Sequence, residues 1–331
     1  MSYNKTFNPI SEFLLPTTTV GSFGKPDYLV KARQDFYQAK IKKVELRKLE
    51  ERATQEFIDM QERVGLDVLV DGEAERGDMA TFFAEKLDGF KISEPVRSYG
   101  NRYYKKPIIV SEIKFREPLT EYFFTFTQQR TRRPVKGILT GPYTLMDWSF
   151  DEFYGSREKV VAAFAAALRL EVQALIQAGC KIIQIDEPAL SARTDEIDLA
   201  IDGLKQVLDG FEIYSITHIC YGAFEALVPR IPELPVKQID LEFSGRNFEL
   251  LEQLKGHPFP QDVGLGIFDV HTRKIKTRMQ ILEGLMRALL FFKLEQIWVD
   301  PDCGLKTRTL AEAEKALREM VTTVKSVRVD P

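Results

Sequence analysis

The sequence predicts an α/β fold of the (β/α)8 barrel (TIM barrel) class. Short β-rich runs alternate with helical patterns along all 331 residues, enough chain for one barrel with extensions. The strand runs are nearly continuous in apolar residues, as in strands buried on both faces. No Gly-rich dinucleotide fingerprint follows the first run, which disfavours the rival, a doubly wound open sheet. With no internal repeat and no low-complexity linker, we expect one barrel domain over residues 1–331.

The first elements are set by β-branched runs and by the positions of Gly and Pro. The first expected strand is "TTTVGSF" at 17–23, and "DVLVDGE" at 67–73 is the second. Between them, residues 28–64 are amphipathic and lack Gly and Pro, which predicts a helical N-terminal extension of one helix or two. Two β-rich runs in 91–115 flank a Gly-Asn turn signal, so we expect an inserted β-hairpin after strand 2. The third strand is "VKGILTGP" at 135–142.

The second half of the chain begins with the clearest helix, residues 156–179. Ser156 is its expected N-cap and Gly179 its expected C-cap. Five more strand signals follow, separated for the most part by helical patterns. They are strands 181–188, 212–222, 236–245, 262–271 and 296–304, with helical patterns at 247–256 and 277–292.

Composition limits the classes of function. The chain is 44% hydrophobic and 29% charged, which is ordinary for a soluble globular protein. A net charge of −3 and a pI near 5.9 disfavour a nucleic-acid or membrane-surface partner. We find no apolar run of the roughly 18 residues that a membrane span needs. The N-terminus lacks signal-peptide regions, and three cysteines make no disulfide framework, so we expect a cytoplasmic protein with reduced thiols.

Reactive residue types collect where the expected strands end. The chemistry of such barrels sits at the carboxyl ends of the strands. Two of the three histidines, His218 and His271, lie at these ends, as do two of the three cysteines, Cys220 and Cys303. This uneven placement indicates a site at that face.

His218 and Cys220 form the core of an expected metal site. Residues i and i+2 of a strand point to the same side, so both side chains point together. Glu242 and Cys303 end two further strands, and zinc takes His nitrogen, Cys thiolate and carboxylate oxygen. Thiolate ligands favour zinc over magnesium or calcium. The alternative is a buried cysteine beside a satisfied histidine.

Other residues at these ends have two interpretations each. Glu73 and Asp186 are either caps of the following helices or carboxylates that bind a substrate ammonium. His271 is either a loop residue without a role or a proton donor near neutral pH. Trp148, after the third strand, is either packing or a stacking platform for a flat ring.

The motifs at the strand ends resemble one family. "TTTVGSF", "DVLVDGEAERGDM", "VKGILTGP", "IIQIDEPAL", "HICY", "DLEFSG", "FDVH" and "WVDPDCGLKTR" are similar to the catalytic barrel of cobalamin-independent methionine synthase, from about residue 15 to 325. The resemblance implies a methyltransferase of methionine biosynthesis, with homocysteine as methyl acceptor and no nucleotide cofactor. It implies one zinc ion held by His218, Cys220, Glu242 and Cys303.

The same resemblance assigns residues to substrate and donor. Val20, Gly21 and Ser22 match the positions for the homocysteine carboxylate, and Glu73 and Asp186 match those for its ammonium. His271 matches the proton donor. The positions that meet folate in the full-length enzymes are matched by Arg102, Tyr103 and Trp148.

The chain departs from the family's pattern where the methyl donor binds. Full-length members carry a second, N-terminal barrel that helps bind the folate tail, and here about 15 residues precede the first strand. Ala192 stands where the family has a folate-contacting Glu, and Thr272–Arg273 replace the usual Ser-Pro. Short single-barrel relatives are thought to take methyl from methylcobalamin or a methylated corrinoid protein, and we expect such a donor.

Several alternatives stay open at this point. They are a methyl-folate donor, transfer to another thiol such as coenzyme M, a metal-free barrel like uroporphyrinogen decarboxylase, and a non-enzymatic partner of a corrinoid protein. Coenzyme M has no ammonium for Glu73 and Asp186 to bind, and a metal-free barrel has no use for the four expected zinc ligands.

Overall fold

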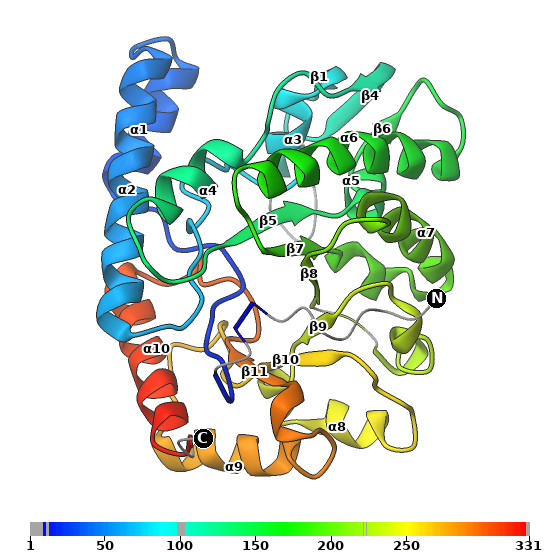
Figure 1. The fold of residues 1–331 in the computed structure, drawn as a ribbon. Helices are drawn as coiled ribbons and strands as arrows, with labels where there is room; N and C mark the ends of the chain where they lie inside the picture. Colours follow the sequence, from blue (N-terminus) through cyan, green and yellow to red (C-terminus); the bar gives the residue numbers. More distant parts are fainter. Residues whose placement is uncertain (1–8, 11–12, 98–102, 221, 223, 329–331) are drawn as a thin grey trace. The chain divides into compact units, whose positions relative to one another are not determined.

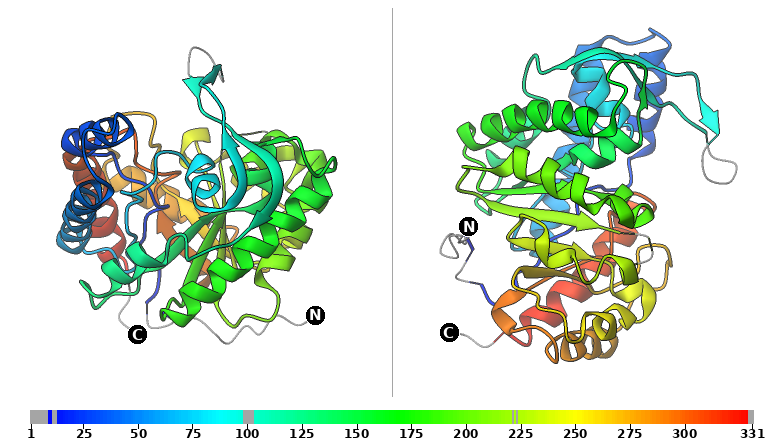
Figure 2. Two further views of the ribbon diagram at one scale, coloured as in Figure 1. Left: turned by 90° about the horizontal axis from the view of Figure 1, so that it is seen from above. Right: turned by 90° about the vertical axis from the view of Figure 1, so that its right-hand side faces the viewer.

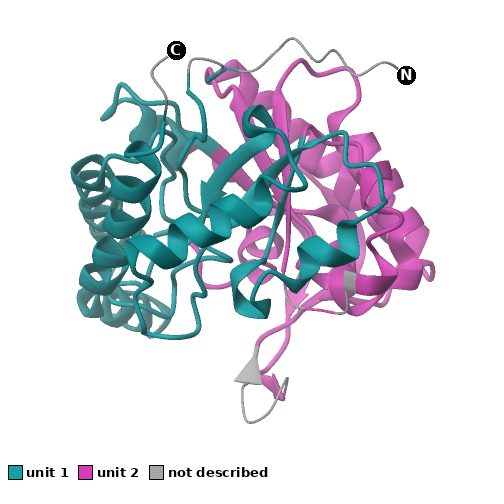
Figure 3. Cartoon of the chain, turned by 90° about the horizontal axis from the view of Figure 1, so that it is seen from below, with its two compact units in different colours: residues 1–75, 123–136, 238–331 teal, residues 76–122, 137–237 magenta. Residues whose placement is uncertain are grey.

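The structure, a computed structural model, describes residues 9–10, 13–97, 103–220, 222 and 224–328. The chain divides into two compact units (Figure 3). Unit 1 comprises residues 1–75, 123–136 and 238–331, and unit 2 comprises residues 76–122 and 137–237. The expectation of one domain over residues 1–331 stays a prediction.

The core of unit 2 is a layer of buried strands with helices packed beside it. β5 (Lys136–Thr140), β7 (Ile182–Asp186) and β8 (Tyr214–Ile219) are neighbours in that order, and all of their residues are buried. β7 and β8 pair in parallel from Ile182↔Tyr214 to Asp186↔His218. These strands confirm the predictions at 135–142, 181–188 and 212–222.

Helix α6 (Arg157–Gln177) packs against α5 (Pro142–Asp147) and α7 (Ile197–Leu208), as Figure 1 shows. Its N-cap is Ser156, as predicted, and the Ser156 hydroxyl accepts from the N–H of Lys159 at 3.3 Å. The C-cap is Ala178 rather than Gly179, because Gly179 takes the left-handed position just beyond it, with φ of +92°. By length and composition alone α6 could cross a membrane, but half of its apolar window is buried, which fits a core helix.

The expected hairpin region is β-structured where the structure describes it. β1 (Asp88–Ile92) pairs antiparallel with β4 (Pro107–Lys114), and the edge of β4 meets β6 (Phe150–Asp151). β2 (Val96–Arg97) pairs with β3 (Tyr103–Tyr104). Residues 98–102, which include the expected Gly-Asn turn, lie outside the described part of the chain, so the inserted hairpin stays a prediction.

Unit 1 contains the last three predicted strands. β10 (Asp262–Gly266) lies between β9 (Gln238–Leu241) and β11 (Ile297–Asp300), and both pairings are parallel. Their side chains are almost all buried, as expected for strands covered on both faces.

The first two predicted strands form single bridges instead of ladders. Within the described residues, 17–23 pairs only at Thr17↔Val299 and Phe23↔Leu305, and 67–73 pairs at Leu69↔Val135. The extended conformation of the second segment ends early, because Gly72 and Glu73 have φ of +77° and +57°. The chain has an α/β fold, but the described ladders do not show an eight-stranded barrel closing.

Helices cover unit 1 from several sides. The expected helical stretch 28–64 forms two helices, α1 (Asp27–Tyr37) and α2 (Lys43–Val64), separated by a short turn. Figure 2 shows α1 and α2 in blue beside the red α10 (Leu310–Lys325), and α2 contacts both of the others. The other helices of the chain are short. They are α3 (Thr81–Lys86), α4 (Glu121–Gln128), α8 (Glu249–Leu254) and α9 (Arg278–Ala288), with 3-10 turns Pro188–Ala192, Thr194–Glu196, Phe224–Ala226, Ile231–Glu233, Ser244–Arg246 and Leu294–Gln296.

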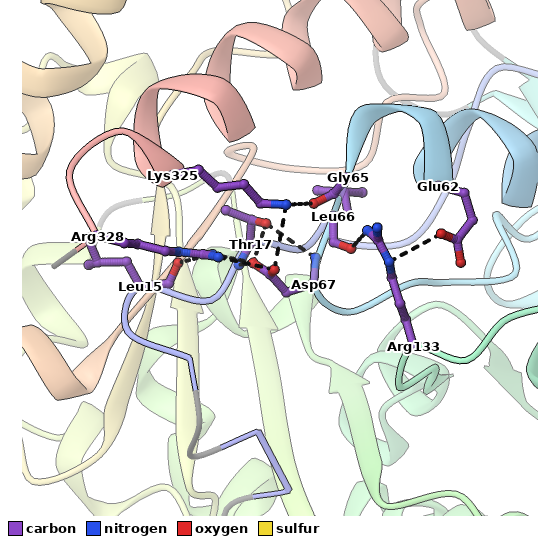
Figure 4. Close-up of polar contacts among 9 residues, drawn as sticks. All are labelled: Leu15, Thr17, Glu62, Gly65, Leu66, Asp67, Arg133, Lys325 and Arg328. Atoms are coloured by element: carbon purple, nitrogen blue, oxygen red, sulfur yellow. Dashed lines mark hydrogen bonds and ion pairs between the residues drawn. The ribbon is translucent and has the colours of Figure 1, made fainter. Parts of the chain in front are cut away.

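A buried carboxylate, Asp67, ties the C-terminal end of unit 1 to its first two predicted strands (Figure 4). It accepts from the N–H and the hydroxyl of Thr17 at 2.8 and 2.7 Å, and from Nη1 of Arg328 at 3.2 Å. Arg328 also donates to the carbonyl of Leu15 at 2.9 Å. Burial alone would raise the pKa of Asp67, but hydrogen bonds from Arg328 and Thr17 bring that pKa below its ordinary value.

Candidate active site

The ends of β7 and β8 place two predicted site residues side by side. Asp186 is the last residue of β7 and pairs in register with His218 on β8, and both side chains are buried. Nε2 of Gln184 donates to Oδ1 of Asp186 at 2.7 Å, which fixes the carboxylate on its strand. A buried carboxylate held in this way can accept from a substrate cation without reorganising.

The neighbouring Glu187, to which the sequence assigned no role, anchors the chain directly after β7. Its carboxylate accepts from the N–H of Tyr143 at 3.1 Å and from the N–H and hydroxyl of Thr144, both at 2.7 Å. Its own N–H donates to the carbonyl of His218 at 3.0 Å. Burial raises the pKa of Glu187 to about 8, against the effect of the bonds from Thr144 and Tyr143. A Cβ at Gly141 would come within 2.1 Å of this carboxyl, so the glycine allows the close approach.

The backbone after β8 packs tightly onto the 3-10 turn Pro188–Ala192. The hydroxyl of Ser191 donates to the carbonyl of Cys220 at 2.8 Å. A Cβ at Gly222 would lie 2.4 Å from Ser191, which leaves room only for glycine. Cys220 is buried and does not form a disulfide.

Three segments of unit 1 meet around Ser22. The N–H of Leu305 donates to the carbonyl of Ser22 at 2.7 Å, and the N–H of Phe23 donates to the carbonyl of Gly72 at 3.2 Å. The predicted residues Ser22, Glu73 and Cys303 therefore lie on adjoining segments. Val20 and Gly21 are buried in the same stretch.

The backbone of Glu73 is in a conformation that L residues rarely adopt. Its φ is +57°, and its N–H donates to Oδ1 of Asp71 at 2.8 Å. Such a backbone costs roughly 1–3 kcal/mol, and residues held in it cluster at binding and catalytic sites. The strain favours the ligand-binding interpretation of Glu73 over a simple helix cap.

The loops after β9 and β11 are joined by Asp302, a second residue that sequence reasoning did not assign. Its carboxylate accepts from the N–H of Phe243 at 3.2 Å, of Ser244 at 2.9 Å and of Gly245 at 2.6 Å. Burial raises the pKa of Asp302 well above its usual range; the Ser244 bond opposes this rise, and the charge of Glu242 adds to it. The only sign in the sequence was the position of Asp302 beside Cys303.

The four predicted zinc ligands divide between the two units. His218, near the end of β8, and Cys220, directly after that strand, belong to unit 2, whereas Glu242 and Cys303 belong to unit 1. One imidazole and two thiols form a donor set that suits zinc in tetrahedral geometry. Glu242 is buried just after β9, and its carboxylate lies above Gly245, where a Cβ would come within 2.5 Å of Oε1.

His271 lies on an exposed loop that is held in place by Arg308 and Thr307. Its N–H donates to Oδ1 of Asp269 at 2.7 Å. The buried Arg308 donates from Nη2 to the carbonyls of Asp269, at 3.0 Å, and of Thr272. The hydroxyl of Thr307 donates to the carbonyl of Val270 at 3.3 Å, so the loop is fixed on both sides of His271.

The residues expected to meet the methyl donor are described only in part. Trp148 is the C-cap of α5 and is partly buried. The preceding Asp147 accepts from Arg157 and Arg193, each at 2.8 Å, which steadies the end of the helix. Tyr103 belongs to β3, whereas Arg102 lies outside the described residues.

Sequence comparison finds one family over nearly the whole chain. Residues 15–326 match the model of "Cobalamin-independent synthase, Catalytic domain". A protein of Saccharolobus solfataricus named methionine synthase is 36% identical over 316 residues, covering 95% of each chain. A 5-methyltetrahydropteroyltriglutamate–homocysteine methyltransferase of Syntrophotalea carbinolica is 40% identical over 328 residues, which are 95% of this chain but 43% of that protein.

Structural comparison agrees with the sequence comparison. A B12-independent methionine synthase from Shewanella sp. W3-18-1, solved in complex with selenomethionine, superposes with a TM-score of 0.82 at 27% sequence identity. The match covers 96% of this chain and 98% of the other. The α/β fold is therefore that of the catalytic barrels of these enzymes.

Proposed function

Because the chain belongs to the family of cobalamin-independent methionine synthases, through their catalytic domain, we propose that it methylates the sulfur of homocysteine to give methionine. The observation that carries this proposal is the pair His218 and Cys220 at the buried end of β8, in a chain whose residues 15–326 match the family's catalytic domain. We further propose that the chain forms one closed (β/α)8 domain with an inserted hairpin and works in the cytoplasm.

The proposed zinc ligands are His218, Cys220, Cys303 and, as the fourth, Glu242. A zinc ion held by these residues would favour the thiolate of the substrate, which is the nucleophilic form of a thiol. The support is the donor set itself together with the burial of His218, Cys220 and Glu242, which excludes water from competing.

The proposed homocysteine site has one group of residues for the carboxylate of the substrate and another for its ammonium. Backbone groups of Val20 and Gly21 and the hydroxyl of Ser22 hold the carboxylate, while Glu73 and Asp186 accept from the ammonium. The fixed carboxylate of Asp186 and the strained backbone of Glu73 support this assignment. The two carboxylates also distinguish an amino-acid thiol from coenzyme M, which has no ammonium.

The methyl group comes, in this proposal, from methylcobalamin or a methylated corrinoid protein. The departures at Ala192 and Thr272–Arg273 favour this donor. A sulfur–carbon bond forms, the thiol proton leaves to solvent, and the cobalt–carbon bond breaks with both electrons staying on cobalt, as cob(I)alamin. Arg102, Tyr103 and Trp148 are the proposed donor contacts.

A methyl-folate donor is the second candidate. The name of the Syntrophotalea relative includes a methyl-folate donor. With that donor, the exposed His271 would protonate the leaving nitrogen as its bond to methyl breaks. The two donors make different demands on His271, because cob(I)alamin leaves without a proton.

The test is a methionine assay with homocysteine and each donor in parallel. Methionine from methylcobalamin or a methylated corrinoid protein is the expected result; production from free methyl-folate alone would reverse the donor proposal. No methionine from any donor would refute the proposed function. In the variant Cys303→Ser, we expect bound zinc and turnover to fall together, and unchanged zinc content would refute the ligand assignment.

A further inference from the structure

We propose that Asp302 is a positioning residue that sets the geometry of Glu242 and Cys303 for zinc. The inference rests on the proposed function, because it concerns the same metal site. It assigns a role to a carboxylate that the ligand set itself does not use.

The carboxylate of Asp302 accepts hydrogen bonds from successive backbone amides. Three successive N–H groups, from Phe243 to Gly245, point at its two oxygens over 2.6–3.2 Å. One side chain therefore fixes the whole turn that follows β9.

Asp302 is itself fixed from β10. Its N–H donates to the carbonyl of Phe268 at 3.1 Å. A Cβ at Gly266 would come within 2.3 Å of Oδ1 of Asp302, so this glycine permits the contact between strand and carboxylate. The backbone of Asp302 is thus bonded to the segment after β10, and its carboxylate is bonded to the turn after β9.

Two proposed zinc ligands adjoin the residues that this arrangement fixes. Glu242 directly precedes Phe243, and its Oε1 lies over Gly245. Cys303 directly follows Asp302. A change at the Asp302 carboxylate therefore displaces the backbone on which Glu242 sits and loosens the backbone of Cys303. Partners that orient metal ligands in this way typically contribute 10–100-fold to metal affinity.

The chain contains a matched control for this chemistry. Asp151 also accepts from three successive backbone amides, those of Phe153, Tyr154 and Gly155, at 3.0, 2.9 and 2.7 Å. That turn is exposed and carries no cysteine or histidine. Replacing either aspartate by asparagine removes one acceptor oxygen from a turn of successive backbone amides, since an amide group accepts through one oxygen only.

The experiment compares Asp302→Asn and Asp151→Asn in the full-length chain. Zinc affinity is measured by competition with a chelator, the ligand field by absorption of the cobalt(II)-loaded protein, and stability by thermal unfolding of the metal-free protein. We expect Asp302→Asn to weaken zinc binding by about 10–100-fold and to shift the cobalt bands. Asp151→Asn should leave both unchanged.

The outcomes separate the inference from the proposed function. If the wild type binds zinc and makes methionine while Asp302→Asn binds zinc equally well, the inference alone is wrong. A lower unfolding temperature with unchanged zinc affinity and cobalt spectrum would mean a purely structural role, which also overturns it. A wild type that binds no zinc removes the proposed function and the inference with it.

A second variant covers the case in which Asp302→Asn does not fold. Gly245→Ala leaves Asp302 in place and pushes a methyl group against Oε1 of Glu242. Weaker zinc binding in this variant supports the arrangement of Glu242 over the turn. Wild-type zinc affinity in a folded Gly245→Ala protein would contradict it.

Discussion

Nη2 of Arg308 donates a 3.0 Å hydrogen bond to the carbonyl oxygen of Asp269, two residues ahead of His271. The same nitrogen also reaches the carbonyl of Thr272, one residue beyond His271. A single buried guanidinium therefore spans the loop, and the position of the imidazole depends on it.

Replacing Arg308 should misplace His271. In Arg308→Met the two carbonyls lose their donor, and we expect kcat with methyl-folate to fall by about 100-fold, the scale of a displacement of about 1 Å. Zinc content should stay at the wild-type level, since the proposed zinc ligands are unchanged. The exposed Arg273→Met is the control, and equal kcat in both variants would exclude a positioning role for Arg308.

His271→Asn distinguishes the two methyl donors. An asparagine cannot supply the proton that a folate nitrogen needs, so we expect the folate-dependent rate to drop by about 10²–10⁴-fold. The rate with methylcobalamin should change little, because cob(I)alamin leaves unprotonated. Steady-state assays with both donors on one preparation would show this split, and equal losses with both would refute the role.

Replacing Glu187 should affect the free energy of unfolding more directly than it affects turnover. Glu187→Ala leaves two buried N–H groups and one hydroxyl without their acceptor, which costs about 3 kcal/mol or more. Glu187→Gln keeps one acceptor oxygen and should cost less. Urea unfolding measures both against Glu319→Ala on the exposed face of α10, and an equal free energy of unfolding in all three would be inconsistent with this role.

Asp67 should make unfolding depend on pH. Its pKa in the folded protein is lower than the ordinary value of 3.8, so its contribution is fully present above pH 3.8 and disappears as pH falls through the lower folded value. We expect Asp67→Asn to lower the free energy of unfolding by about 2 kcal/mol at pH 7, with a smaller difference below pH 4. The control is Asp59→Asn on the exposed face of α2, and a gap that is constant from pH 7 to pH 3 would contradict the linkage.

Much of the fold could be predicted because most strands are buried on both faces. β7, β8 and β11 consist entirely of buried residues, so β-branched and apolar residues with few interruptions located each of them. The segments 17–23 and 67–73 have similar sequences, but within the part of the chain that the structure describes they pair at single residues. The left-handed backbone at Gly72 and Glu73 adjoins a contact distant in sequence, the bond from the N–H of Phe23 to the carbonyl of Gly72, which a local pattern does not contain.

The candidate site also contains residues that the sequence could identify and residues that it could not. His218, Cys220 and Cys303 are rare residue types, so their placement at the expected strand ends was informative, and the structure has His218 in β8 with Cys220 directly after that strand. Asp302 and Glu187 are common residue types whose partners lie 57–59 and 43–44 positions away in the chain. No spacing rule connects a carboxylate to amides at such separations, so these roles required the structure.

The two glycines that touch Asp302 set a limit on how this chain can vary. A methyl group at Gly266 would overlap Oδ1 of Asp302, and one at Gly245 would overlap Oε1 of Glu242. In a library randomised at both positions and selected for growth without methionine, we expect glycine to return at each as strictly as cysteine returns at position 303. Residues that carry no reactive atom would then be as intolerant of replacement as the reactive residues themselves.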